Sequence, residues 1–71
     1  MQVYIVQEGS IKPVYNLGFV YGVFKNYEDA IRYAAESEME MRDWKENLDF
    51  YKEEIKNDNG LFYSVIKRTL T

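Results

Sequence analysis

The sequence of 71 residues contains no cysteine and no histidine. Without cysteine it has neither a disulfide framework nor a thiolate metal cluster, and without histidine it lacks the commonest metal ligand and the commonest general base. With only three serines, a pair of nucleophile and base is not expected either. The composition therefore predicts a protein that is not an enzyme, with no catalytic residue, no metal site and no cofactor.

Long apolar runs are also missing. Residues 1–6 have no basic leader and are far too short for a signal or membrane-spanning segment, so we expect a cytoplasmic protein without a membrane partner. The formal net charge of −3 disfavours general binding to nucleic acid, because such binding draws its energy from Lys and Arg side chains that displace counterions. It favours basic partners instead.

Glycine and proline, four and one in number, delimit the predicted strands. Residues 2–7 are rich in Val, Tyr and Ile, and residues 14–24 after Pro13 alternate in period two, so each segment predicts a strand. The short connection between them predicts an antiparallel pair. A third strand is predicted at residues 61–70, directly after a cluster of turn residues at 57–60.

A long helix is predicted between the second and third strands, because neither glycine nor proline occurs from residue 27 to residue 58. Asn26 is the expected N-cap, and two acids follow it in the first turn. Nine positions repeat at spacings of three and four, as in the seam of a long helix: Tyr27, Ala30, Ala34, Ser37, Met41, Trp44, Leu48, Tyr51 and Ile55. The fold class is therefore α+β, a single ββαβ domain over residues 1–71. A three-stranded antiparallel sheet of order 2-1-3 is expected to pack on one long amphipathic helix.

The length of this helix does not match the sheet. From Tyr27 to Ile55 a helix would be about 45 Å long, whereas a strand of seven residues spans about 23 Å. Three solutions are open: the helix breaks near Ser37, it crosses the strands obliquely, or its uncovered half packs in a homodimer. For the homodimer, Trp44 is the expected anchor. The predicted interface residues are Met41, Trp44, Leu48, Tyr51 and Ile55.

Acids outnumber bases along the predicted helix. Glu36, Glu40 and Asp43 form a like-charge row at positions i, i+4 and i+7, which either binds a basic partner or is a solvated helix face. Glu28 with Arg32, and Glu38 with Arg42, have the spacing of ordinary exposed ion pairs.

Seven tyrosines and four phenylalanines exceed what one small core absorbs. Because one helix covers one face of a sheet, the other face is expected to present either Tyr15, Phe19 and Tyr21 or Val20 and Phe24. Aromatic strands near Lys67 and Arg68 support an alternative function, a small nucleic-acid-associated regulatory protein that stacks bases on its sheet.

Residues 3–9, with Tyr-Ile-Val before an acidic-Gly turn, residues 21–24 (Tyr-Gly-Val-Phe) and residues 27–34 (Tyr-Glu-Asp-Ala-Ile-Arg-Tyr-Ala) cover about half of the chain. In these segments the sequence resembles very short proteins encoded by phages and prophages of Gram-positive bacteria. The resemblance implies no catalytic residues. It implies an accessory protein that binds a bacterial host or defence protein and inhibits or modulates it.

Overall fold

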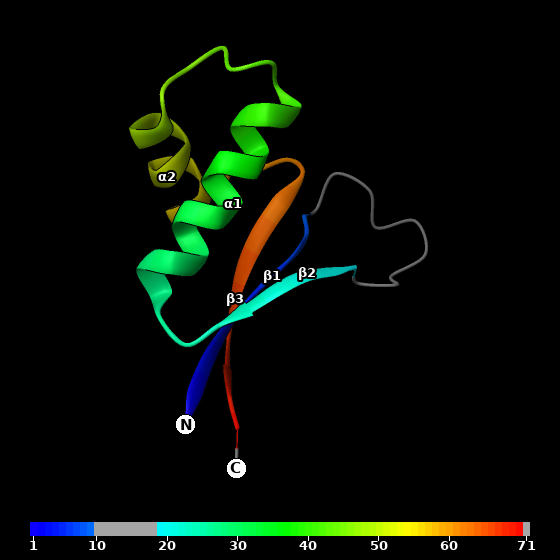
Figure 1. The fold of residues 1–71 in the computed structure, drawn as a ribbon, viewed down its shortest axis with the longest axis vertical. Coiled ribbons are helices and arrows are strands. Elements are labelled where there is room, and N and C mark those ends of the chain that lie inside the picture. Colours follow the sequence, from blue (N-terminus) through cyan, green and yellow to red (C-terminus); the bar gives the residue numbers. More distant parts are fainter. Residues whose placement is uncertain (10–18, 71) are drawn as a thin grey trace.

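The computed structural model describes residues 1–9 and 19–70. Their order of elements is β1 (Gln2–Glu8), β2 (Val20–Phe24), α1 (Tyr27–Met41), α2 (Leu48–Lys56) and β3 (Tyr63–Thr69), as Figure 1 shows. The α+β class is confirmed, but two helices stand where one was predicted. Most of the predicted first half of the second strand and most of its connection to the first lie outside the described residues.

The three strands form an antiparallel sheet of order β2-β1-β3, as the sequence predicted. In the register, Val6 of β1 lies opposite Gly22 of β2 and Val65 of β3. The pairing shifts after Val6, so that the next paired residue of β2 is Val20 and Tyr21 is the extra residue of a bulge. The bulge brings Tyr21 to the same side of the sheet as Tyr63, where their rings lie 5.0 Å apart.

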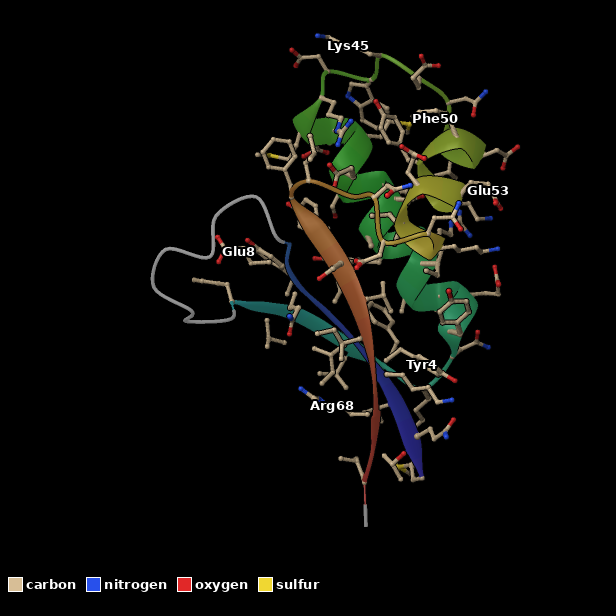
Figure 2. The ribbon with its side chains drawn as sticks, turned by 180° about the vertical axis from the view of Figure 1, so that it is seen from behind. Tyr4, Glu8, Lys45, Phe50, Glu53 and Arg68 are labelled. Atoms are coloured by element: carbon tan, nitrogen blue, oxygen red, sulfur yellow. The ribbon has the colours of Figure 1, made fainter. Side chains whose placement is uncertain are left out.

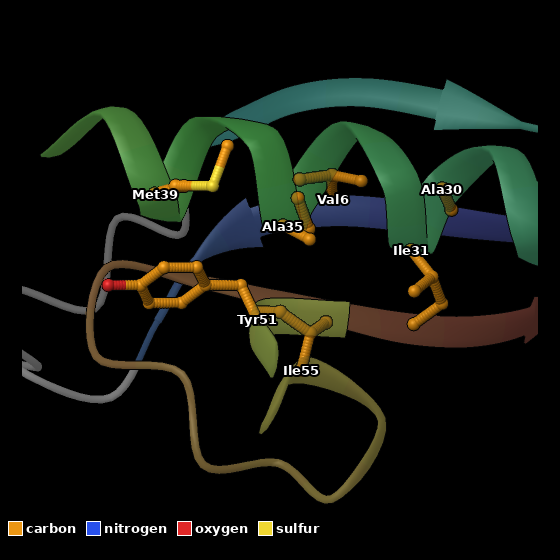
Figure 3. Packing of buried hydrophobic residues seen from close by; sticks show 8 residues of the cluster. Val6, Ala30, Ile31, Ala35, Met39, Tyr51 and Ile55 are labelled. Atoms are coloured by element: carbon orange, nitrogen blue, oxygen red, sulfur yellow. The ribbon is translucent and has the colours of Figure 1, made fainter. Parts of the chain in front are cut away.

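Both helices lie on one side of the sheet (Figure 1). Helix α1 contacts all three strands, and α2 contacts α1 and β3. In Figure 3, Tyr51 and Ile55 of α2 lie beside Ile31 and Ala35 of α1. The alanines of α1 let the backbones approach closely, so a small chain still encloses a core. The buried members of this core are Val6, Ala30, Ile31, Ala34, Ala35, Met39, Tyr51 and Ile55.

The helix is not continuous, so of the three open solutions the structure shows a break, but the predicted position of the break near Ser37 is wrong. Helix α1 ends at Met41 rather than near Ser37, and the chain reverses before α2 begins at Leu48. The reversal removes the length mismatch, because the fifteen residues of α1 span about 22 Å, close to the about 23 Å of a seven-residue strand. The chain thus covers its own helix, and the uncovered half that motivated the homodimer does not exist.

In the described part of the chain, no helix has the length and apolarity needed to cross a membrane.

Left-handed residues end both helices. After α1, Asp43 has a φ of 62°, its amide donates to the carbonyl of Glu40 (3.1 Å), and the amide of Trp44 donates to the carbonyl of Met39 (2.9 Å). This is the Schellman arrangement that glycine usually completes. Helix α2 ends in the same way, with Asp58 at a φ of 60°.

Two asparagines begin the helices. The side chain of Asn26 accepts a hydrogen bond from the amide of Glu28 (2.9 Å), which confirms the predicted N-cap. The side chain of Asn47 accepts one from the amide of Phe50 (2.8 Å) and starts α2 in the same way. The second cap was not predicted from the sequence.

The left-handed position after α2 gives a testable prediction. Asp58→Gly should raise the free energy of unfolding by about 0.5–1 kcal/mol, because glycine adopts a positive φ without steric cost. Asn57→Gly is the matched control, since Asn57 has a φ of −91° and glycine gains nothing there. Urea denaturation monitored by circular dichroism measures both. A lower stability for Asp58→Gly would contradict the left-handed assignment.

Candidate functional site

The five residues predicted as an interface separate into two groups. Tyr51 is 1% exposed and Ile55 is also buried, so both belong to the core, and Leu48 packs against it half-buried. Met41 and Trp44 are 54% and 60% exposed. The five predicted interface residues therefore do not form one surface. The chain reversal after α1 buries the residues of α2 in the core and leaves Met41 and Trp44 exposed.

Only two of the three acids predicted as a row, Glu36 and Glu40, lie on one face of α1. Glu36 and Glu40 lie on the exposed side of α1, and Glu36 accepts a hydrogen bond from the Nε of Arg32 (3.3 Å). Asp43 lies in the turn after the helix and is not part of that face. The predicted pair of Glu28 with Arg32 is replaced by a contact of Glu28 with the Nζ of Lys56 (3.6 Å), which joins the two helices.

Glu38 is fully buried, although it was predicted as half of an exposed ion pair. Its pairing with Arg42 is confirmed at 2.9 Å. The carboxylate also accepts hydrogen bonds from three consecutive backbone amides, those of Leu61 (3.1 Å), Phe62 (3.1 and 3.2 Å) and Tyr63 (3.0 Å). A buried carboxylate with this many donors is fully satisfied, and it ties the last turn of α1 to the start of β3.

The spacing along α1 explains the position of Glu38. Ile31, Ala34 and Glu38 follow one another at i, i+3 and i+7, so this acid lies on the buried stripe of the helix. This spacing was the available sign in the sequence. Gly60 completes the site, because a Cβ there would lie 2.7 Å from the Cδ1 of Ile55 and 3.3 Å from a carboxylate oxygen of Glu38.

An open groove of about 460 Å³ lies at the turn between the helices, which we call the tip groove. Its apolar and aromatic lining is supplied by Met41, Phe50, Tyr51, Leu61 and Phe62. Figure 2 places Phe50 and Lys45 at this end of the molecule, far from Tyr4 and Arg68. Three lining residues donate hydrogen bonds to the carboxylate of Glu38, namely Arg42, Leu61 and Phe62. This one carboxylate therefore joins the α1 side of the groove to its β3 side. The sequence reading missed Phe50, Leu61 and Phe62, because they come together only after the reversal.

A second surface runs between α1 and the strands, and we call it the tyrosine seam. Its rings touch in pairs: Phe24 with Tyr33 (5.5 Å between centroids), Tyr21 with Tyr63 (5.0 Å) and Phe19 with Tyr21 (5.4 Å). Phe19, Tyr21 and Tyr33 are exposed, whereas Phe24 and Tyr63 are half-buried. The seam therefore presents ring faces and edges to solvent.

Acidic side chains lie close to Tyr63 in the seam. The pKa of Tyr63 is raised, first by the loss of solvation on burial and then by the nearby phenols of Tyr21 and Tyr33 and the carboxyl groups of Glu38 and Glu40. Tyr63 therefore stays a neutral hydrogen-bonding group at physiological pH.

Across residues 1–9 and 19–70, no group of three or more acidic side chains is arranged so that it could hold a metal ion. What the two surfaces offer chemically is apolar and aromatic contact area, with acids beside one of them.

Comparison with known proteins adds no relative. No protein-family model matches the chain, and neither a curated protein nor a solved structure is detectably similar to it.

Proposed function

We propose that the protein is a non-enzymatic interaction module that binds a basic segment of another protein through the tyrosine seam and the acids beside it. The observation that carries this proposal is the juxtaposition of exposed Tyr21 and Tyr33 with the negative field of Glu40 around Tyr63. Glu36 lies one turn before Glu40 on the same exposed side of α1, where it pairs with Arg32, so Glu40 is the acid that acts most directly on the seam.

Such a surface suits Lys and Arg side chains. A cation over an exposed tyrosine ring gains about 0.5–1 kcal/mol, and nearby carboxylates accelerate the encounter with a basic partner and suppress acidic ones. Tyrosine is also among the residue types enriched at protein interfaces. The seam thus offers both contact area and charge selectivity.

In the cell, we propose the role that the resemblance to phage and prophage proteins implies. The module would act as an accessory protein that occupies a basic surface of a bacterial host or defence protein and inhibits or modulates it. An acidic, aromatic surface competes well for sites that normally bind phosphates.

The alternative, base stacking on the sheet, has less support. On the side of the sheet away from the helices, β1, β2 and β3 present Ile5, Val23 and Ile66, which are aliphatic. The ring pairs of the described strands lie on the helix side. We therefore favour a protein partner over a nucleic acid.

The double variant Glu36→Lys/Glu40→Lys tests the seam. We expect it to lose at least tenfold in affinity for an arginine-rich peptide and for any protein captured from bacterial lysate, because it reverses the field that selects cations. Exposed charges contribute little to stability, so the fold should lose no more than about 1 kcal/mol. Isothermal titration calorimetry and thermal unfolding measure the two quantities.

The matched control is Glu53→Lys/Glu54→Lys on α2, which changes the net charge by the same amount. Equal losses in both double variants would show that only net charge matters, and no loss in either would sink the proposal. Tyr33→Leu separates the aromatic contribution, since it removes a ring and leaves every charge in place.

A further inference from the structure

Exposed apolar side chains gather at the end of the molecule where the helices reverse. Met41 ends α1, Trp44 lies in the turn, Phe50 lies in the first turn of α2 and Leu61 precedes β3. All four are exposed, and Trp44 is the most exposed of them at 60%. Three separate segments thus supply one apolar surface, which is typical of a protein-binding site.

The backbone holds Trp44 outward in a defined position. Its φ is 58°, and its amide donates to the carbonyl of Met39 at 2.9 Å, so the hydrogen bonding that ends α1 fixes this residue. Its neighbours Asp43 and Lys45 line the tip groove, but Trp44 does not. An exposed indole and an apolar groove therefore adjoin each other without the indole filling the groove.

The groove has the size and lining of a receptor for such a side chain. Its volume of about 460 Å³ falls within the range of about 300–1,000 Å³ for sites that bind small molecules. Met41, Phe50, Leu61 and Phe62 would surround an inserted ring with apolar atoms. Tryptophan is the residue type most enriched among side chains that anchor interfaces in this manner.

The rim of the groove indicates which partner fits. Lys45 is positive, Asp43 and Glu46 are negative, and the charge of Arg42 is paired with Glu38, so the rim carries both signs. A nucleic acid or an anionic membrane would select a rim of one sign. A rim with both signs can meet its own copy, because the positive side chains of one copy can lie opposite the negative side chains of the other.

We propose that the occupant of the tip groove is a second copy of this chain. In the dimer, Trp44 of each copy inserts into the tip groove of the other. Because the indole and the groove lie at the same end of the molecule, one twofold axis satisfies both insertions and closes the assembly. The tip groove and the tyrosine seam share no residue, so the seam stays free for its own partner.

The single tryptophan makes this dimer directly observable. Light scattering after size exclusion should give a mass that rises from 8.5 kDa to twice that value as concentration increases. The fluorescence of Trp44 should shift to the blue with the same midpoint, because the indole leaves water in the same step. Trp44→Ala should raise the dimer Kd at least about 30-fold, and Leu61→Lys should leave a monomer whose emission remains that of an exposed indole.

Control variants separate this surface from the others. Val23→Lys changes an exposed residue on the helix-free side of the sheet, and Glu36→Lys/Glu40→Lys changes the seam; both should dimerise normally. A monomer at every concentration overturns the proposal. So does a dimer in which the emission of Trp44 stays constant, or one that Val23→Lys breaks and Trp44→Ala does not. The seam proposal survives each of these outcomes, because peptide binding is measured separately.

Discussion

Replacing Glu38 with glutamine should lower the free energy of unfolding by about 3–5 kcal/mol, the usual loss when one partner of a buried charged pair is removed. The variant keeps the shape of the side chain. In either amide orientation, however, the new NH2 group faces N–H donors, because both carboxylate oxygens accept from the amides of residues 61–63 and one also accepts from Arg42. Urea denaturation followed by circular dichroism measures the loss, which approaches the whole stability of a domain this small.

Glu36→Gln is the matched control, since it makes the same chemical change two residues earlier, on the exposed side of α1, at a half-exposed pair with Arg32. Exposed pairs contribute at most about 1 kcal/mol, so this variant should stay close to the parent. Similar small losses in both variants would mean that Glu38 is solvated and does not join α1 to β3.

The second large effect is expected at Tyr51. Tyr51→Ala should lower the free energy of unfolding by about 3–5 kcal/mol, because it empties a buried aromatic position between α2 and α1. Since Tyr51 packs within its own chain, the full loss should already appear well below the dimer Kd. Because Tyr51 also lines the tip groove, a further loss is expected above the dimer Kd. Chemical denaturation at two concentrations well below the dimer Kd and well above it provides the measurement.

Tyr33→Ala is the control, a tyrosine that is exposed and contacts the ring of Phe24. Its expected loss is about 0.5–1.5 kcal/mol, the range for an aromatic pair. A loss at Tyr51 that vanished in the monomer would place this residue in an interface between chains, as the sequence originally suggested, and would contradict the observed core.

The strands and their order could be predicted because their signals are local. The alternation of β2, the turn residues before β3 and the N-cap at Asn26 depend on neighbouring residues, and the order β2-β1-β3 follows from short connections. The core of α1 could be predicted only in part. Ala30 and Ala34 lie on the predicted stripe, whereas Ile31, Ala35 and Met39 are core residues that the stripe did not contain.

The break between the helices could not be predicted from helix-breaking residues, because the turn contains neither glycine nor proline. Aspartate and tryptophan adopt the left-handed conformation instead, a choice that depends on the packing of α2 against α1. One local sign existed: Asn47-Leu48-Asp49 resembles Asn26-Tyr27-Glu28, an asparagine cap followed by an apolar residue and an acid. The spacing of three and four residues that predicted one long helix continues through Asn47, so it concealed this cap.

The chain reversal between α1 and α2 also explains why only some of the predicted interface residues are exposed. Met41 and Trp44 were assigned to an interface because they are large and apolar, and they are exposed as that role requires. Tyr51 and Ile55 had the same pattern, but they became core residues because α2 turns back onto α1. Glu38 was misread because a charged residue is normally solvated, and its partners lie in a segment distant in the sequence.

The central strand of the sheet is also the first to be synthesised. Tyr4 of β1 lies between Phe24, which leaves the ribosome soon after it, and Lys67 of β3, which follows both helices in the sequence. A two-stranded β1–β2 pair is marginally stable in water, and pairing between segments far apart in sequence slows folding. During synthesis, one edge of β1 therefore stays unpaired until β3 is made. The amides that donate to Glu38 belong to residues 61–63, so they too are made only just before β3. The helical hairpin can form early, but the domain becomes a folded unit only when its last strand is free of the ribosome.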